Sequence, residues 1–392
     1  MKLLRTLSTP RLLVLLAVVA LAATAGTAIA VASGGGGPKP APKGLAQAIH
    51  DGLAAKAPSG LSARITFTNK LFPSDALTGD HVSALMSGAS GRLWVGNDGR
   101  GRLELQSSAG DVQIVWSRGK VTVYDASSNT VYRATLPQRK AGAEAPDRSD
   151  HRGPPSANRI AEFLSKLRAH ASVSGARPTD VGGQPAYNVV VSPKHNGGLL
   201  GSAQLAWDAV RGVPLRVAIY AKGSSAPVLS LEASEISYGP VPASSVDLTP
   251  PANAKTVDLS LPARSPGSRH SHAKPATGLR AVRAVAGFPV LAPDTLAGRT
   301  REAVRSIGSH AVVVLYGHGL AAIAVVERKA DTNGQRRGAL SSLPEVSLGG
   351  VTGHELATQL GTVIEWKRTG VGYALGGSLS APAAEAAARS FK

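Results

Sequence analysis

The sequence predicts an α+β fold in which a long antiparallel sheet with a few helices forms one domain and a small α+β domain follows it. The chain has 392 residues, which is more than one compact domain of about 100 to 200 residues usually holds. A hydrophobic fraction of 43% is enough for a sizeable core. From Leu61 onward, apolar and polar residues alternate in short runs separated by turn residues, which is typical of antiparallel strands with one buried face.

The N-terminal segment, residues 1–33, is predicted to be a membrane signal. Three basic residues precede an uncharged run over residues 12–32, and a Gly/Pro-rich spacer follows over residues 34–43. At about 1.5 Å per helical residue, such a run crosses a hydrocarbon core of roughly 30 Å. A cleaved signal peptide is the alternative, because small residues at 28–32 have the spacing that a signal peptidase accepts. We therefore expect the rest of the chain to be extracytoplasmic, either as part of a single-pass cell-membrane protein or in secreted form.

The first domain is predicted over residues 44–261 and begins with an amphipathic helix. Leu45, Ile49 and Leu53 recur at helical spacing until Pro58 ends the pattern. Strands with period-2 alternation follow, and their tight turns require consecutive strands to run antiparallel. These strands are predicted over residues 61–71, 91–97, 102–107, 112–118, 120–125 and 130–136.

A polar stretch over residues 137–155 is predicted to be an exposed loop, and a second helix follows it. Ser156 is a candidate N-cap after two prolines, and an apolar stripe of Ile160, Phe163 and Leu164 continues to Leu167. This stripe is expected to cover the sheet. Further strands are predicted over residues 186–191, 202–207, 215–220 and 228–238.

A basic linker over residues 262–285 precedes a small α+β domain over residues 286–392. The linker's lack of acidic residues is typical of a solvated tether, and a contact with anionic lipid headgroups or wall polymers is the alternative. In the last domain we expect helices over residues 295–307 and 352–360, the second opened by a Thr352-x-x-Glu355 capping box, and a final helix after Ser380. Strands are expected over residues 311–316, 321–328, 363–367 and 372–375.

The sequence contains no recognisable catalytic or metal-binding motif. The absence of cysteine excludes disulfides, thiolate metal sites and cysteine nucleophiles. The ten histidines have no companion carboxylates at helical spacing, and His270 and His272 lie in a segment without acids. Aromatic residues make up only 4% of the chain, which argues against stacked nucleic-acid bases. We therefore predict a non-enzymatic protein with no cofactor, no metal and no nucleic-acid partner.

A long sheet with only two covering helices need not fill its concave face, so it can hold an apolar guest. The predicted strands carry aromatic and aliphatic side chains that suit a cavity wall, and the same side chains also suit ordinary core packing. The candidate ligand-binding residues are Phe67, Leu93, Trp94, Leu105, Trp116, Val123, Tyr124, Tyr132, Leu205, Trp207 and Tyr220.

The chain resembles a bacterial superfamily that contains the outer-membrane lipoprotein carrier LolA and the sigma-factor regulator RseB. The resemblance rests on Gly91-Arg92-Leu93-Trp94, Arg102-Leu103-Glu104-Leu105, Gln184-Pro185-Ala186-Tyr187 and Ala206-Trp207-Asp208, and on the strands over residues 112–116, 119–125, 130–132, 189–191 and 236–238. It covers residues 45–254 and implies a LolA-like, strongly bent antiparallel half-barrel sheet, covered by helices, whose apolar concavity shields acyl chains from water. Residues 288–391 are similar to a small bacterial domain of unknown function.

The residues and the resemblance together predict a membrane-anchored, extracytoplasmic protein that binds lipid or lipoprotein acyl chains. Carrier members of the superfamily are soluble, and lipoprotein members attach through a cysteine that this chain lacks, so a retained N-terminal span favours a tethered lipid handler. The alternative is an RseB-like envelope-stress sensor that docks an anti-sigma factor or another membrane protein. A third possibility is binding of anionic polymers through the net charge of +18, which salt would weaken steeply.

Overall fold

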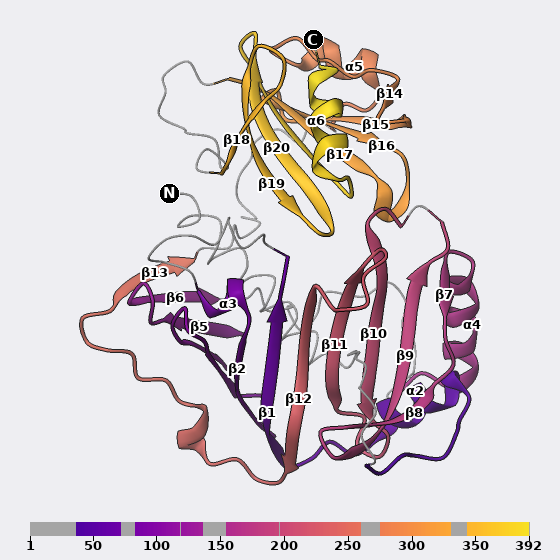
Figure 1. Cartoon of the computed structure of the whole chain (residues 1–392), viewed down its shortest axis with the longest axis vertical. Helices are drawn as coiled ribbons and strands as arrows, with labels where there is room; N and C mark the ends of the chain where they lie inside the picture. The colour runs from indigo at the N-terminus through magenta and orange to yellow at the C-terminus, as the bar shows by residue number, and fades with distance from the viewer. Residues whose placement is uncertain are drawn as a thin grey trace.

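The computed structural model describes residues 37–71, 83–117, 119–135, 154–195, 197–259, 275–330 and 343–391. The predicted membrane segment, nearly all of the predicted loop at 137–155 and much of the basic linker lie outside these ranges. Within them, no helix is long and apolar enough to cross a membrane. The fold is α+β, as predicted: a strongly bent, mainly antiparallel sheet covered by helices is followed by a second sheet with helices of its own (Figure 1).

The first sheet has 13 strands. They are β1 (Gly60–Asn69), β2 (Ala89–Gly96), β3 (Gly101–Gln106), β4 (Val112–Ser117), β5 (Lys120–Asp125), β6 (Thr130–Thr135), β7 (Ala171–Val173), β8 (Arg177–Val181), β9 (Gln184–Pro193), β10 (Leu200–Asp208), β11 (Pro214–Ala221), β12 (Leu229–Tyr238) and β13 (Lys255–Leu259). Their order is β13-β6-β5-β4-β3-β2-β1-β12-β11-β10-β9-β7, and β8 also pairs with β9. The long-range pair of β1 with β12 therefore joins two runs of hairpins into one sheet.

The predicted hairpins from β2 to β6 are confirmed, and their turns use residues that adopt positive φ without large strain. Gly99 has φ 79° and Asn129 has φ 44°, both in the left-handed region that glycine and asparagine favour. Strands β7, β8 and β13 were not expected from the sequence. Strand β13 pairs with β6 in parallel, whereas the other strand pairs of this sheet are antiparallel.

The bend of the first sheet coincides with irregular pairing near its middle. Arg64 lies opposite Glu235 and Ile65 opposite Ala233, so Ser234 of β12 is an extra residue in the ladder. An extra residue bends its strand and increases the local twist. Figure 1 shows β5 and β6 running nearly across the direction of β9 and β10, which gives the sheet its concave shape.

The helices divide the concave face between them. Helices α2 (Leu45–Ala54) and α4 (Ala157–Arg168) pack against each other and over β9 and β10, whereas the short helix α3 (Ala84–Ser87) covers the strands around β1 and β3. Ser156 caps α4 as predicted, because its Oγ accepts a hydrogen bond from the Arg159 amide at 3.4 Å. Both predicted helices of this part of the chain are therefore confirmed.

The second sheet has eight strands in the order β14-β15-β16-β17-β21-β20-β19-β18. They are β14 (Thr295–Leu296), β15 (Arg299–Ile307), β16 (Ala311–Tyr316), β17 (Ile323–Lys329), β18 (Glu345–Ser347), β19 (Thr352–Thr358), β20 (Gly361–Arg368) and β21 (Val371–Gly377). Helices α5 (Leu279–Val285) and α6 (Ala381–Arg389) contribute to its core. The predicted strands at residues 311–316, 321–328, 363–367 and 372–375 and the final helix are confirmed.

Two helices predicted in this region are wrong. Over residues 295–307 the chain forms β14 and β15, because Ala297 and Gly298 adopt positive φ in a tight turn that interrupts any helix. Over residues 352–358 it forms β19, which pairs with β18 on one side and β20 on the other. Pairing on both sides outweighs the local preference of the Thr352-x-x-Glu355 motif, which occurs here inside a strand.

The second sheet stands on one end of the first (Figure 1). The amide of Leu199, before β10, donates a hydrogen bond to Ser378 Oγ after β21 at 2.7 Å. The Gln359 side chain, in the turn between β19 and β20, donates to the Lys70 carbonyl after β1 at 3.0 Å. These contacts place the second sheet beside the end of the first sheet where β1 ends and β10 begins.

Candidate functional site

One face of the first sheet carries an apolar row across its middle strands. Phe67 of β1 lies opposite Leu231 of β12, Leu231 opposite Val217 of β11, Val217 opposite Leu205 of β10, and Leu205 opposite Val189 of β9. Residues directly opposite each other in a sheet point to the same face. We call the face that carries these five residues the inner face and the opposite one the outer face.

Two separate hydrophobic cores lie on the inner face. The core under α3 includes Ile65, Leu85, Leu105 and Val112, and Leu105 is 0% exposed. The core under α2 and α4 is built around Leu45, Ala48, Ile160, Leu164, Tyr187, Val189 and Trp207. The two halves of the concave face are therefore each closed by their own helices.

Between the two cores lies a half-buried strip of aliphatic side chains. It consists of Ala203, Leu205, Val217, Ile219, Leu229 and Leu231. Leu229 and Leu231 pack at the border of the α3 core and Leu205 at the border of the α2/α4 core, but Val217 and Ile219 belong to neither. We call these six residues the apolar strip. It is the part of the inner face that neither group of helices buries.

The covering helices also leave large apolar side chains exposed. Phe163 of α4 was predicted to cover the sheet, but 64% of it is exposed, while Ile160 and Leu164 of the same helix are buried. Leu53 of α2 is 39% exposed. Burying a large apolar side chain stabilises a structure by about 1.5 to 3 kcal/mol. A ligand or partner that covered Phe163 would therefore gain part of this free energy.

The structure does not bring the eleven predicted ligand-binding residues to one surface. Phe67, Leu93, Leu105, Trp116, Val123 and Tyr132 lie on the inner face in or against the α3 core, and Leu205 and Trp207 lie on that face in or against the α2/α4 core. Trp94, Tyr124 and Tyr220 point to the outer face. Of the eleven, only Leu205 belongs to the apolar strip.

Two tryptophans of the first sheet, Trp116 and Trp207, pack closely against neighbouring residues of the sheet. The Trp116 ring lies over Gly101, where a Cβ atom would meet Trp116 Cζ2 at 2.1 Å, so this strand position requires glycine. Trp207 packs beside Tyr187 with ring centroids 6.1 Å apart. The residues predicted from the sequence to bind a ligand include such aromatics but not Val217 and Ile219. Alternation along β11 places these two on the opposite face from Tyr220.

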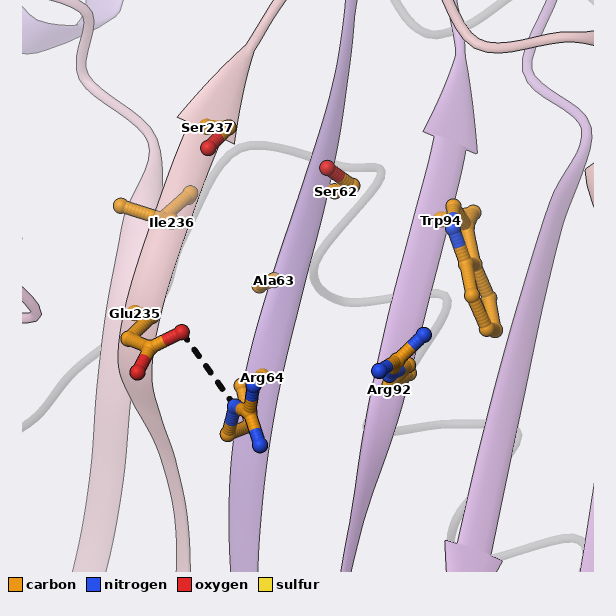
Figure 2. A pocket seen from close by; sticks show the side chains of 8 residues that line it. All are labelled: Ser62, Ala63, Arg64, Arg92, Trp94, Glu235, Ile236 and Ser237. Atoms are coloured by element: carbon orange, nitrogen blue, oxygen red, sulfur yellow. Dashed lines mark hydrogen bonds and ion pairs between the residues drawn. The ribbon is translucent and has the colours of Figure 1, made fainter.

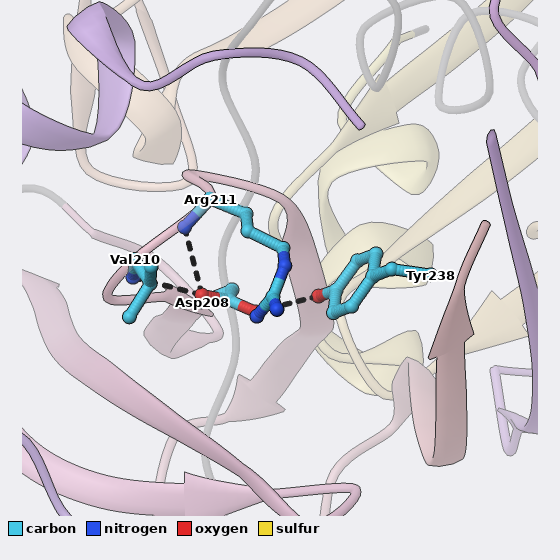
Figure 3. A network of polar contacts seen from close by, with 4 residues as sticks. All are labelled: Asp208, Val210, Arg211 and Tyr238. Atoms are coloured by element: carbon cyan, nitrogen blue, oxygen red, sulfur yellow. Dashed lines mark hydrogen bonds and ion pairs between the residues drawn. The ribbon is translucent and has the colours of Figure 1, made fainter. Parts of the chain in front are cut away.

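A buried polar network holds the turn between β10 and β11 (Figure 3). The Asp208 carboxylate, 0% exposed, accepts hydrogen bonds from the Val210 and Arg211 amides, each at 2.8 Å, and from the Tyr238 hydroxyl at 2.7 Å. The Arg211 guanidinium lies 4.2 Å from the Tyr238 ring centroid. Burial, and the bond to Asp208, raise the pKa of the Tyr238 hydroxyl above its ordinary value. Because the carboxylate is satisfied by its own turn and by β12, the network is structural.

The described residues contain no cluster of three or more His, Asp or Glu side chains that could hold a metal ion. The inner face is distinguished by its half-buried aliphatic strip.

No family model matches the chain, and no curated protein matches it. Several solved structures are similar to the chain. The MucA/MucB complex of Pseudomonas aeruginosa aligns with 15% identity over 88% of this chain and 94% of that chain, with a TM-score of 0.39. An uncharacterized conserved protein from Thermus thermophilus aligns with 11% identity over 55% of this chain and 97% of its own, with a TM-score of 0.32.

A putative outer membrane lipoprotein-sorting protein domain from Vibrio parahaemolyticus aligns with 12% identity over 50% of this chain and 92% of that domain, with a TM-score of 0.21. All three TM-scores lie below 0.5. The solved structures that this chain is similar to include MucB and a putative lipoprotein-sorting domain.

Proposed function

We propose that this protein binds the acyl chains of a lipid or lipoprotein on the apolar strip, as a non-enzymatic binding protein of the cell envelope. The observation that carries the proposal is the half-buried state of Val217 and Ile219 between two closed cores on one concave face. Their side chains remain accessible where a continuous core would have covered them. A ligand that covers the strip would bury the side chains that α2, α3 and α4 leave half-buried.

The energetics favour a long hydrocarbon guest. Each buried CH₂ group contributes about 0.8 kcal/mol, so about eight CH₂ groups laid on the strip contribute about 6 kcal/mol before ordering costs. None of the six residues of the strip is polar or charged. Binding should therefore be nearly indifferent to salt, in contrast to the attachment of an anionic polymer.

Lipid uptake by the full chain tests the proposal. The chain would be stripped of lipid in detergent, exchanged into buffer with a fluorescent fatty acid, and examined by native mass spectrometry and fluorescence. Val217→Asn should weaken uptake by about tenfold, because one polar amide in an apolar contact costs about 1 to 3 kcal/mol. Val115→Asn is the matched control, since Val115 is also half-buried but lies on the outer face. Absence of uptake by the unaltered chain, or equal losses in both variants, would refute acyl binding at this strip.

A second candidate function is the docking of a membrane protein such as an anti-sigma factor, and the second sheet carries the observation that favours it. On the face of this sheet opposite its core, Leu315, Ala324, Gly376, Val363 and Leu356 form one cross-strand row, and Leu315 is 37% exposed. An apolar row of this kind, on a sheet face that no described α-helix covers, is typical of a protein contact.

Leu315→Asp would separate the two candidates. Under the docking proposal the variant loses capture of an anti-sigma factor's extracytoplasmic segment and keeps its lipid uptake. If the unaltered chain captures no such segment, the docking proposal fails and the acyl-binding proposal is unaffected.

A further inference from the structure

The outer face of the first sheet carries a small polar pocket that is separate from the apolar strip. It encloses about 180 Å³ over β12, β1 and β2. Figure 2 shows its polar and aromatic lining, which consists of Ser62, Arg64, Arg92, Trp94, Glu235 and Ser237. The sheet itself separates this pocket from the inner face, because Ala63, between Ser62 and Arg64, points into the α3 core.

The pocket concentrates positive charge where a sheet ordinarily avoids it. Arg64 and Arg92 are directly opposite in the β1–β2 ladder, and like charges at opposite positions destabilise a sheet. Arg64 has one counter-charge, Glu235, with Nε 3.2 Å from the carboxylate. Both of these side chains are largely exposed, so the pair contributes little stability.

Arg92 has no such counter-charge among the described residues. Its cross-strand neighbour on the other side is Glu104, but Glu104 is hydrogen-bonded to Arg102. Arg102 is held in place in turn, because it donates to the Asp247 carbonyl at 2.8 Å and lies over the Trp94 ring, 5.9 Å from its centroid. Arg92 is exposed and lines the pocket, and no described residue accepts a hydrogen bond from its guanidinium.

Hydroxyl groups complete the polar lining. Ser62 lies opposite Ser237 in the β1–β12 ladder and opposite Trp94 in the β1–β2 ladder, so both hydroxyls belong to the same row as the indole. Within the part of the chain that the structure describes, neither serine side chain has a hydrogen-bond partner. Two guanidinium forks and two free hydroxyls are donors that match the oxygen atoms of a phosphate group.

We propose that this pocket binds a phosphate group, either free inorganic phosphate or the phosphate of a small ester. Arg92 and Arg64 donate to the phosphate oxygens, Ser62 and Ser237 add hydroxyl donors, and the Glu235 carboxylate, the one acidic group of the lining, leaves Arg64 when the anion enters. Drug-sized ligands occupy pockets of about 300 to 1,000 Å³, so this smaller pocket suits the phosphate and a short attachment. A lipid held on the apolar strip lies on the other side of the sheet, so its headgroup is not the ligand.

Isothermal titration of the full chain in a non-ionic detergent with inorganic phosphate tests the proposal. We expect saturable binding that weakens as NaCl is added, because screening reduces the attraction between the anion and the arginines. Arg92→Gln should weaken binding by about tenfold or more, since a hydrogen bond to a charged group is lost. Arg133→Gln is the matched control, because Arg133 of β6 is an exposed cation on the same outer face but outside the pocket. Glu235→Gln should strengthen binding, because it removes the competing carboxylate without disturbing the arginines.

Three probes distinguish the source of the phosphate. Glycerol 3-phosphate that binds more tightly than inorganic phosphate would identify a phosphate ester, and inorganic phosphate that binds equally well would identify the free anion. Vesicles containing phosphatidylglycerol, bound in an Arg92-dependent manner, would place the phosphate on a membrane surface. If none of the three probes binds saturably, or if Arg92→Gln and Arg133→Gln weaken binding equally, the outer face is only generally basic and the proposal is overturned.

Discussion

The two sheets bury their apolar faces to different extents. The second sheet closes its core with large aromatic side chains: Trp366, Tyr373 and Phe391 lie with ring centroids 5.1 to 5.8 Å apart, and each is at most 2% exposed. The first sheet divides its inner face into two cores and leaves aliphatic side chains half-buried between them. The difference teaches that a sheet face is filled where its own strands and the segment packed on it supply bulky side chains, or where a helix lies close enough to cover it. The described residues supply no such cover over the apolar strip.

Of the substitutions considered, removing Trp366 from the core of the second sheet should lower the free energy of unfolding most. Trp366→Ala leaves a large cavity in a closed core, and we expect the free energy of unfolding of that part of the chain to fall by about 3 to 5 kcal/mol. Urea titration followed by circular dichroism measures the change. Trp94→Ala removes an equally large but half-buried side chain from the first sheet and should cost clearly less. Equal losses would show that the two sheets do not differ in this respect.

A buried acid should make the second sheet sensitive to pH. Glu327 is 0% exposed, and burial raises the pKa of its carboxyl from 4.5 to about 7, although it accepts a hydrogen bond from the Leu291 amide at 2.8 Å. Because the folded pKa is the higher one, its contribution to stability is fully present below pH 4.5 and is lost as pH rises through about 7. The loss should amount to about 3 kcal/mol.

Thermal unfolding between pH 4.5 and 8 measures this dependence. Glu327→Gln should flatten the fall in melting temperature of the second sheet while leaving that of the first sheet unchanged. The same fall in the variant would assign the pH dependence to another group.

The polar network of the first sheet should have an intermediate effect. Tyr238→Phe removes the hydroxyl that donates to buried Asp208, and we expect a loss of about 1 to 2 kcal/mol in the free energy of unfolding. Tyr124→Phe is the control, because its hydroxyl bonds to Asn129 at a less buried position, at 3.2 Å. A loss in Tyr238→Phe no larger than in the control would mean that the turn between β10 and β11 is held by its own amides alone.

The smallest effect on stability should come from the apolar strip itself. Val217→Ala removes methyl groups that are already partly in water, so we expect a loss below about 1 kcal/mol, together with weaker lipid uptake. Val112→Ala, at a 0% exposed position of the α3 core, should cost about 2 kcal/mol and leave uptake unchanged. The opposite ranking would place Val217 in a closed core and remove the basis for a binding surface there.

Part of the geometry of the candidate site could be predicted from the sequence. Leu93 and Trp94 are neighbours on one strand, and so are Val123 and Tyr124, so alternation alone assigns each pair to opposite faces. A list that combines them cannot describe one wall. The same rule separates Val217 and Ile219 from Tyr220, but choosing the aliphatic residues requires knowing which face stays open, and that depends on the placement of α2, α3 and α4.

By itself, the sequence determined the α+β class, the hairpins from β2 to β6, the starts of α4 and α6, and the absence of cysteine chemistry. These properties depend on residues close together in the chain: period-2 alternation, turn glycines, the Ser156 cap of α4 and the proline in the first turn of α6 act over a few residues. Only the tertiary structure decided the pairing of β1 with β12, the parallel pairing of β13 with β6, and the strand that replaced a helix at β15. It also decided which apolar side chains stay half-buried and that two arginines share a pocket. Pairing partners far apart in sequence compete with many alternatives, and burial at any position is set by whatever packs onto it.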